Sequence, residues 1–405
     1  MTGALIAVPE CDDEFDFACR NYLLEGRVYL IWRSKMRVGV PKEIKNNEFR
    51  VGMTPGSVRE YVAHGHKVMV QTNAGVGIKA SDDDYRAAGA SIAPDARTIF
   101  AENDMIVKVK EPQPSEYVQL REGQILYTYL HLAPDPEQTK GLLKSGVTGV
   151  AYETVTDDFG GLPLLAPMSE VAGRLAIQAA AYALTAPQGG RGLLMGGVPG
   201  VLPAKVLIIG GGVVGTHAAK MAMGLGADVT ILDRSLRRLS YLDDIFEGRA
   251  KTRYSTFEAL SEEADQADVV IGAVLIPGAS APKLVTRDML KRMKNGAVLV
   301  DVSIDQGGCF ETSKPTTHAE PTYAVEGIVH YCVANMPGAV PLTSSHALNN
   351  ATLAFGLQLA DQGLDALRKN KHLRHGLNVH RGKVTHQAVA SALNLPFVEA
   401  MEALG

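Results

Sequence analysis

Four polar side chains stand where a mostly parallel sheet would bring them together, and their types suit chemistry on a small molecule. Lys110, His131 and Asp305 each stand at or just after the end of a strand-like apolar segment, and Arg50 lies in the loop after the first such segment. Ligands of open parallel sheets bind outside the carboxyl ends of the strands, so we expect these side chains to be neighbours. Two cations, an imidazole and a carboxylate could hold a small carboxylate substrate and move a proton on it.

Position alone leaves a structural interpretation open for the same residues. Lys108 and Lys110 could both lie on a solvated face of the sheet, and His131 could simply cap the turn that follows it. In that case the four side chains would share no ligand.

A second group of residues predicts a dinucleotide site. Gly210, Gly212 and Gly215 follow the strand-like segment 205–210 and fit the G-x-G-x-x-G pattern, which lets the backbone approach a pyrophosphate at a helix N-terminus. Asp233 ends the next strand-like segment, about 20 residues further on, where a carboxylate accepts hydrogen bonds from the ribose hydroxyls. The alternative is a structural glycine turn with a capping aspartate.

The residues around Asp233 also bear on which nicotinamide dinucleotide would bind. Asp233 would repel a 2′-phosphate, which favours NAD over NADP. Arginine is the residue that accommodates this phosphate, however, and three arginines follow immediately: Arg234, Arg237 and Arg238. We therefore predict NAD, and the arginines leave NADP open.

Other chemistries lack their motifs. The sequence has no G-x-S-x-G elbow, no G-x-x-x-x-G-K-[ST] phosphate loop and no H-E-x-x-H zinc pair, which argues against hydrolase, nucleotidase and metalloprotease functions. Cys309 and Cys332 lie near His330, but their spacing matches no common zinc pattern, so buried thiols are favoured. The four cysteines form no C-x-x-C pair, which fits a reducing cytoplasm.

Composition excludes several further classes of protein. With 46% hydrophobic and 21% charged residues, the 405-residue chain is typical of a globular protein rather than a disordered one. Forty basic against 44 acidic side chains give a net charge of −4, so we expect no nucleic-acid partner. Apolar stretches such as 206–216 are broken by glycine and fall short of the roughly 20 residues of a membrane span, so we expect no membrane span.

The elements that must position these residues follow from the alternation of apolar and helical patterns. At roughly 150 residues per domain, the length predicts two or three domains. Between residues 36 and 155 the alternation indicates βαβ units and a mostly parallel sheet. The expected strands are 37–42, 67–72, 105–110, 124–130 and 147–152, and the expected helices are 56–64, 81–88, 96–102, 115–120 and 135–144.

A long helix over 170–185, capped by Ser169, is expected to lead into a second βα series. Its alanines would allow close packing at a domain connection. The expected strands of the second series are 205–210, 228–232, 268–274 and 297–302, followed by helical patterns over 345–368. The residues therefore predict the α/β class with two separate doubly wound domains.

The first 35 residues differ from the rest. Acidic residues between positions 10 and 16 interrupt the apolar stretch that a secretory signal needs. We expect an unstructured or loosely attached tail before Met36, where the strand pattern begins. The competing interpretation is that 29–32 add an edge strand.

Five segments are highly specific when taken as a set: RVGVPKEIKNNEFRVGMTP (37–55), KVKEP (108–112), TYLHLA (128–133), DVSIDQGGCFE (301–311) and YCVANMPGAVP (331–341). Through them the chain from Met36 to about Phe397 resembles the NAD-dependent L-alanine dehydrogenases. That family shares its fold with the NAD-binding component of proton-translocating transhydrogenase. The resemblance covers nearly the whole chain except the tail.

The resemblance implies roles for the residues singled out above. Arg50 and Lys110 would hold the substrate carboxylate and carbonyl, His131 would be the acid/base, and Asp305 would help to polarise water or the amino group. A larger set would surround NAD: Ser169, Gly210, Gly212, Val213, Gly215, Asp233, Arg238, Ser255, Val274, Leu275, Val302, Ser303, Ile304, Asp305, Val333, Ala334, Asn335 and Met336.

The resemblance also points to the late helix as the place of a magnesium ion in some relatives. Gln358 and Gln362 offer no charged ligand there, so we predict no metal.

The resemblance also implies an arrangement of domains that composition does not reveal. An NAD-binding Rossmann domain, 166–341, would be inserted into a discontinuous substrate domain, 36–165 and 342–405, with 1–35 as an N-terminal extension. The active site would lie in the cleft between the two domains. A cytoplasmic homo-oligomer, most simply a hexamer, is expected.

The implied reaction is the reversible oxidative deamination of L-alanine to pyruvate and ammonium. Two alternatives remain at this point. One is an NAD-binding transhydrogenase subunit, and the other is a dehydrogenase of a longer amino acid, because the sequence indicates the chemistry of a substrate site but not its size.

Overall fold

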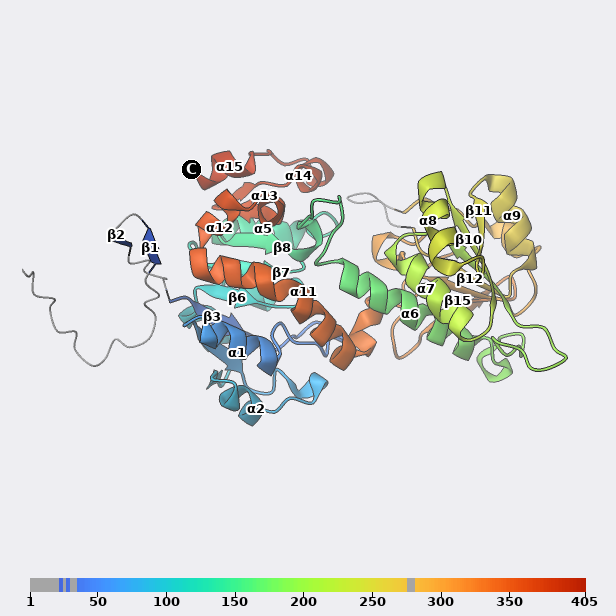
Figure 1. The fold of residues 1–405 in the computed structure, drawn as a ribbon, viewed down its shortest axis with the longest axis horizontal. Helices are drawn as coiled ribbons and strands as arrows, with labels where there is room; N and C mark the ends of the chain where they lie inside the picture. Colours follow the sequence, from blue (N-terminus) through green and yellow to red (C-terminus); the bar gives the residue numbers. More distant parts are fainter. Residues whose placement is uncertain (1–21, 25–26, 30–34, 275–280) are drawn as a thin grey trace, which may run out of the picture.

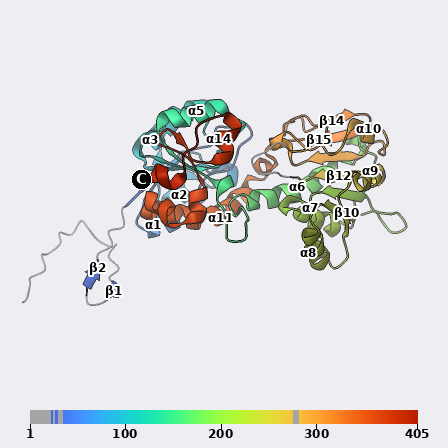
Figure 2. The same cartoon turned by 90° about the horizontal axis from the view of Figure 1, so that it is seen from above.

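The structure is a computed structural model that describes residues 22–24, 27–29, 35–274 and 281–405. Two α/β halves, each built on one sheet, lie next to each other along the longest axis of the molecule (Figure 1). The helices α6 (Ala166–Ala183) and α11 (Pro341–Gln362) run across the junction, as the view from above also shows (Figure 2).

The first half is built on an eight-stranded sheet with the order β17-β16-β8-β7-β6-β3-β4-β5. The strands β3 to β8 pair in parallel, whereas β16 pairs antiparallel with β8 and β17 antiparallel with β16. The bounds are β3 (Arg37–Val40), β4 (Lys67–Gln71), β5 (Ser91–Ala93), β6 (Met105–Val107), β7 (Ile125–Thr128), β8 (Thr148–Ala151), β16 (Leu377–His380) and β17 (Lys383–Val384).

Helices cover this sheet, and its central strands are apolar and buried along their length, as expected for parallel strands covered on both faces. The core joins side chains of the strands with Leu348 and Leu359 of α11, which lies over the sheet (Figure 1). The helices are α1 (Pro55–Ala63), α2 (Asp82–Ala87), α3 (Ala96–Glu102), α4 (Pro114–Tyr117), α5 (Pro136–Ser145), α12 (Leu364–Lys369), α13 (Lys371–His375), α14 (Gln387–Leu393) and α15 (Ala400–Leu404).

The second half is built on a seven-stranded sheet with the order β11-β10-β9-β12-β13-β15-β14, parallel except at β14. Its strands are β9 (Lys205–Ile209), β10 (Asp228–Asp233), β11 (Lys251–Tyr254), β12 (Val269–Gly272), β13 (Val298–Asp301), β14 (Thr322–Val325) and β15 (Ile328–Tyr331). Its helices are α7 (Val213–Gly224), α8 (Leu236–Phe246), α9 (Phe257–Gln266) and α10 (Arg287–Leu290).

The α/β class and the mostly parallel sheets are confirmed, but several boundaries differ from the predictions. Most of the predicted strands run too far at their carboxyl ends, so Lys110 and His131 each lie three residues beyond β6 and β7. The strands β5, β11 and β14 to β17 were not predicted, because they are short and several of them carry polar residues. The late helical pattern is two helices, because Gly363 breaks it with φ +57° and ψ −136°.

The prediction that Ser169 caps the long connecting helix is wrong. The helix begins at Ala166, so Ser169 lies inside its first turns. Pro167 explains the earlier start, because its fixed φ suits the first turn of a helix and its missing N–H has no partner to lose there.

The N-terminal extension is described only in part. The strands β1 (Tyr22–Leu24) and β2 (Arg27–Tyr29) pair antiparallel with each other and form a separate two-stranded sheet. The alternative edge strand over 29–32 falls largely outside the described residues, as does most of the predicted tail. Across the residues that are described, no helix has both the length and the apolar character that crossing a membrane requires.

Candidate active site

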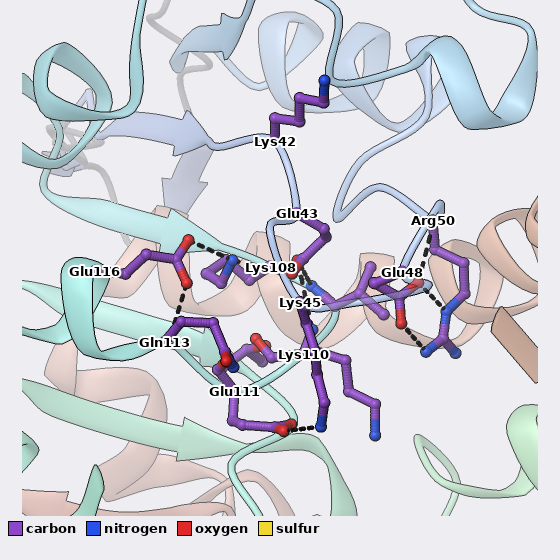
Figure 3. A network of polar contacts seen from close by, with 12 residues as sticks. Lys42, Glu43, Lys45, Glu48, Arg50, Lys108, Lys110, Glu111, Gln113 and Glu116 are labelled. Carbon is purple, nitrogen blue, oxygen red and sulfur yellow. Dashed lines mark hydrogen bonds and ion pairs between the residues drawn. The ribbon is translucent and has the colours of Figure 1, made fainter. Parts of the chain in front are cut away.

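Arg50 is buried in the loop between β3 and α1 and is held by a carboxylate two residues away. The loop ends where Thr54 caps α1, with the Ser57 N–H donating to its hydroxyl. The Arg50 Nε and Nη2 donate to the two carboxylate oxygens of Glu48, at 2.7 and 2.5 Å (Figure 3). Both side chains are almost fully buried. A two-point pair of this kind fixes the plane of the guanidinium.

Asn335 completes this pair from the other half of the molecule. Its side-chain oxygen accepts from Arg50 Nη2 at 2.8 Å, and its Nδ2 donates to Glu48 at 2.9 Å. Burial raises the pKa of Glu48, but the hydrogen bonds and charge of Arg50 outweigh it and bring the pKa to about 2. Glu48 is therefore ionised at neutral pH and balances the charge of Arg50.

Two lysines of the same segment have opposite surroundings. Lys108 is fully buried, and its Nζ donates to Glu43 at 3.0 Å and to Glu116 at 2.8 Å (Figure 3). Lys110 is also buried, at 7% exposed, but across the described part of the chain its ammonium has neither a hydrogen bond nor an ion pair. The interpretation that both lie on a solvated face is wrong, because the strand they follow is covered on both sides.

His131 lies in the loop after β7, with its ring half-buried. Burial lowers the pKa of the ring, as does the charge of Lys110, while Glu153, Glu111 and Asp305 raise it; the net direction is downward. The ring is therefore neutral at pH 7 and can accept a proton. The capping interpretation is not supported, because Asp135 caps the following helix through the N–H of Gln138.

Asp305 reaches the same place from the second half. It lies in a short 3-10 turn, Ile304–Gln306, after β13, and its carboxylate accepts from the N–H of Asn335 at 3.3 Å. Its charge acts on the ring of His131. The structure thus brings Arg50, Lys110, His131 and Asp305 to the junction of the two halves.

The glycine turn after β9 has the form that a dinucleotide requires. Gly210 has φ +101°, and a Cβ there would lie 2.6 Å from the carbonyl oxygen of Ala273. A Cβ on Gly215 would lie 1.9 Å from the carbonyl oxygen of Gly210, so the helix packs directly on the turn. A Cβ on Gly212, the N-cap of α7, would meet nothing within 4 Å. The open side of the turn, at a helix N-terminus, fits a pyrophosphate.

Asp233 ends β10 beside this turn. Its carboxylate accepts from the N–H of Gly211 and from the N–H of Ser235, both at 2.8 Å. Arg238 donates to the carbonyl oxygen of Gly211 and, at 2.6 Å, to the hydroxyl of Thr216. Arg238 is therefore bound to the turn itself in this structure.

The remaining residues predicted around a dinucleotide fall into three groups. Ser255 follows β11, and its N–H donates to the carbonyl oxygen of Asp233; the hydroxyl of Ser303 donates to the carbonyl oxygen of Val274. Ile304, Val333 and Met336 are buried. Ser169 lies on α6 and Val213 on α7, and these two helices pack against each other. Val302 and Ala334 lie beside the buried residues just named, and Leu275 lies outside the described residues.

One cluster that sequence analysis missed has the composition of a metal site. His64, His66 and Asp361 each offer a ligand atom within 4.8 Å of the others. The Nδ1 of His66 accepts from the N–H of Met36, so its Nε2 carries the proton and donates to Asp361 at 3.1 Å. Hydrogen bonds therefore account for the approach of His66 to the carboxylate. On the late helix, the side-chain oxygen of Gln358 accepts a hydrogen bond from Asn370.

Sequence analysis also missed Glu48 and Glu153 as site residues. Glu48 stands two positions before Arg50, a spacing that gives no sign of a two-point pair unless the loop is known. Glu153 is far from His131 in the sequence, and only the parallel pairing of β7 with β8 brings them together.

Comparison with known proteins identifies relatives over nearly the whole chain. A family model described as "Alanine dehydrogenase/PNT, N-terminal domain" matches residues 39–172, and "Alanine dehydrogenase/PNT, C-terminal domain" matches residues 176–387. The alanine dehydrogenase of Halomonas elongata is 60% identical over 371 residues, covering 91% of this chain and 100% of its own length. The alanine dehydrogenase of Bacillus subtilis is 54% identical over 371 residues, with 91% and 98% covered.

Solved structures agree with this assignment. An L-alanine dehydrogenase structure superposes with a TM-score of 0.86 at 52% identity, covering 89% of this chain and 99% of its own. A transhydrogenase from Sinorhizobium meliloti reaches a TM-score of 0.73 at 27% identity, with 87% and 99% covered. The resemblance noted in the sequence is thereby confirmed. The chain belongs to the alanine dehydrogenase/PNT family.

Proposed function

We propose that this protein is an NAD-dependent L-alanine dehydrogenase, which catalyses the reversible oxidative deamination of L-alanine to pyruvate and ammonium. One observation carries the proposal: Asn335 of the second half contacts Arg50 of the first half through its side chain and donates its N–H to Asp305. Lys110 and Asp305 also lie close enough to His131 to shift the pKa of its ring, Lys110 downward and Asp305 upward. A substrate cation, an acid/base group and a carboxylate thus meet beside the half that holds the glycine turn. The high identity to alanine dehydrogenases supports the choice of substrate.

The residues of the second half fit a dinucleotide. The open side at Gly212 and the acidic end of β10 at Asp233 would receive the pyrophosphate and the ribose. A bound NAD would supply the acceptor for the hydride of the alanine α-carbon. NAD is preferred to NADP in this proposal, because the carboxylate of Asp233 would repel a 2′-phosphate and Arg238 is engaged with the turn.

The first half would supply the substrate contacts and the proton transfers. Lys110 and Arg50 would hold the carboxylate and the carbonyl so that the α-carbon faces the nicotinamide. Because Glu48 already balances Arg50, Lys110 provides the net positive charge. His131, neutral at pH 7, would take a proton from the water that attacks the imine carbon and return one as ammonia leaves. Asp305 would orient the water or the amino group.

We extend the proposal to the division of the chain. Residues 36–165 and 342–405 would form the substrate domain, and 166–341 the NAD domain, with 1–35 as an extension. The pairing of β16 with β8 supports this division, because it places C-terminal residues in the first sheet. We also propose that the protein works in the cytoplasm as a homo-oligomer, most simply a hexamer, which rests on the family resemblance.

The activity is tested by supplying substrates separately and together. Purified protein should oxidise NADH when pyruvate and ammonium are both present, and neither one alone should support oxidation. Longer 2-oxo acids in place of pyruvate would show whether a longer amino acid is preferred. Hydride exchange between two dinucleotides without pyruvate would favour the transhydrogenase alternative instead. Sedimentation showing an active monomer would contradict the oligomer.

A further inference from the structure

The backbone of His131 has an unusual conformation for a residue with a side chain. Its φ is +47°, in the left-handed region that residues other than glycine enter rarely. Such a conformation persists when the surrounding structure holds it. At His131 the holding group is a carboxylate on the neighbouring strand connection.

That carboxylate belongs to Glu153, in the short 3-10 turn Tyr152–Thr154 directly after β8. It accepts from the N–H of His131 at 2.6 Å and from the N–H of Leu130, with both oxygens, at 3.2 Å. One partly buried acceptor thus satisfies two successive backbone donors of the loop that carries His131.

The same carboxylate also faces the ring. The His131 Nδ1 lies 3.9 Å from Glu153 Oε1, beyond hydrogen-bond range but close enough for a strong charge interaction. The ring stacks on Tyr129, with centroids 5.7 Å apart and planes 8° from parallel, and the Tyr129 hydroxyl is anchored on the carbonyl oxygen of Leu164. With Nδ1 turned to Glu153, the Nε2 on the other edge of the ring is left for a substrate.

Several charged groups besides Glu153 surround the ring. Lys110 lowers the pKa of His131, while Glu111 and Asp305 raise it by less than Glu153 does. The charge of Glu153 also raises the pKa of His386, although burial lowers that pKa overall. The Nδ1 of His386 is buried without a hydrogen-bond partner among the described residues. Among the groups that raise the pKa of His131, Glu153 contributes most.

We propose that Glu153 is the positioning residue of the reaction: it sets the backbone and ring of His131 and, through its charge, the pH range in which the ring accepts a proton. The proposal rests on the acid/base role given to His131 in the proposed function. It follows the general arrangement in which a third group orients a catalytic base.

The test is the variant Glu153→Gln, in which an amide oxygen can still accept the two backbone N–H groups but the charge is gone. Without the negative charge the protonated ring is less stable, so its pKa falls. The acidic midpoint of log(kcat/KM) for alanine oxidation should move to lower pH by about one unit. The variant Glu153→Asp keeps the charge, so its midpoint should lie closer to that of the wild type than the midpoint of Glu153→Gln does.

A second measurement follows the protonation of the His131 ring without using enzyme activity. Diethyl pyrocarbonate modifies a histidine ring in its neutral form and not in its protonated form, and peptide mass spectrometry reports the extent of modification at His131 as a function of pH. The midpoint of modification should fall by the same amount in Glu153→Gln. The matched control is Glu137→Gln, which removes an exposed carboxylate of α5 and should leave both midpoints unchanged.

The outcomes separate this inference from the proposed function. Unchanged midpoints in Glu153→Gln, with alanine oxidation intact in the wild type, would mean that Glu153 only caps the loop, and the inference would be overturned. An equal shift in Glu137→Gln would also overturn it, because net charge would then be the cause. If the wild type did not oxidise alanine, the proposed function would fail, and the modification midpoints would still decide whether Glu153 governs the ring.

Discussion

The two regions proposed to bind ligands are built in different ways. In the second half, the dinucleotide region is a backbone structure, with Gly210 in a left-handed turn and Gly215 packed directly on it. In the first half, the substrate region is a set of ionised side chains, in which Glu48 holds Arg50 and two carboxylates enclose Lys108.

This difference shows what each region depends on. The glycine turn is determined by residues close together in the sequence, since β9, the turn and α7 are consecutive. The charged region depends on contacts over long separations, such as Arg50 with Asn335 and Lys108 with Glu43. Substitutions should therefore act locally in the second half and through distant partners in the first.

The largest effect is expected at His131. His131→Ala should lower kcat by roughly 10² to 10⁴, the usual contribution of a positioned acid/base, and should hardly change NADH affinity, because the glycine turn is elsewhere. Steady-state kinetics and NADH fluorescence titration measure the two quantities. His375→Ala, at an exposed histidine of α13, is the control. Near wild-type turnover in His131→Ala would contradict this role and would mean that Asp305 or solvent performs the proton transfers.

Substitutions of Lys108 and Lys110 should have different effects, the first on the stability of the fold and the second on substrate binding. Lys108→Met leaves Glu43 and Glu116 buried without a cation and should lower the free energy of unfolding by about 3 to 5 kcal/mol. Lys110→Ala should keep the wild-type melting temperature but lose pyruvate affinity and turnover, since an unpaired carboxylate in a desolvated site costs about 2 to 5 kcal/mol. Melting curves and pyruvate KM for both variants check this. A stable Lys108→Met with poor pyruvate binding would reverse the two roles.

A smaller effect is expected at Asp233. Asp233→Ala should weaken NAD binding about ten- to a hundredfold, which is about 1.4 to 2.8 kcal/mol, through lost hydrogen bonds to the ribose. Asp233→Asn keeps an acceptor for the N–H of Gly211, so it distinguishes the turn contact from the ribose contact. Isothermal titration with NAD and NADP measures both. Equal use of NADP by the wild type would contradict the preference and point to Arg234, which is exposed, or to Arg238.

The smallest effect is expected from removing the N-terminal extension. A shortened protein that begins at Met36 should keep its activity and its melting temperature within about 2 °C. The reason is that the match to the family models begins at residue 39, and that the Halomonas elongata relative aligns over its full length while covering 91% of this chain. Scanning calorimetry and the NADH assay check this. A larger loss would show that the extension packs on the body of the protein.

Local patterns determined much of this protein. The α/β class, most parallel strands and the glycine turn with Asp233 all follow from short segments, because each depends on neighbours in the chain. The specific segments around Arg50, Lys110, His131 and Asp305 were sufficient to indicate the family, which the comparisons confirm. The early start of α6 was missed although its cause, Pro167, is equally local.

Tertiary structure decided the rest. Lys108 and Lys110 are two residues apart and of one type, yet one is enclosed by Glu43 and Glu116 and the other is left without an ion partner among the described residues. Three contacts join residues that are distant in the sequence. They are the pairing of β16 with β8, the hydrogen bond between Asn335 and Arg50, and the hydrogen bond from the His131 N–H to the carboxylate of Glu153. These contacts depend on how the strands pair and how the halves meet. No local pattern of residue types carries that information.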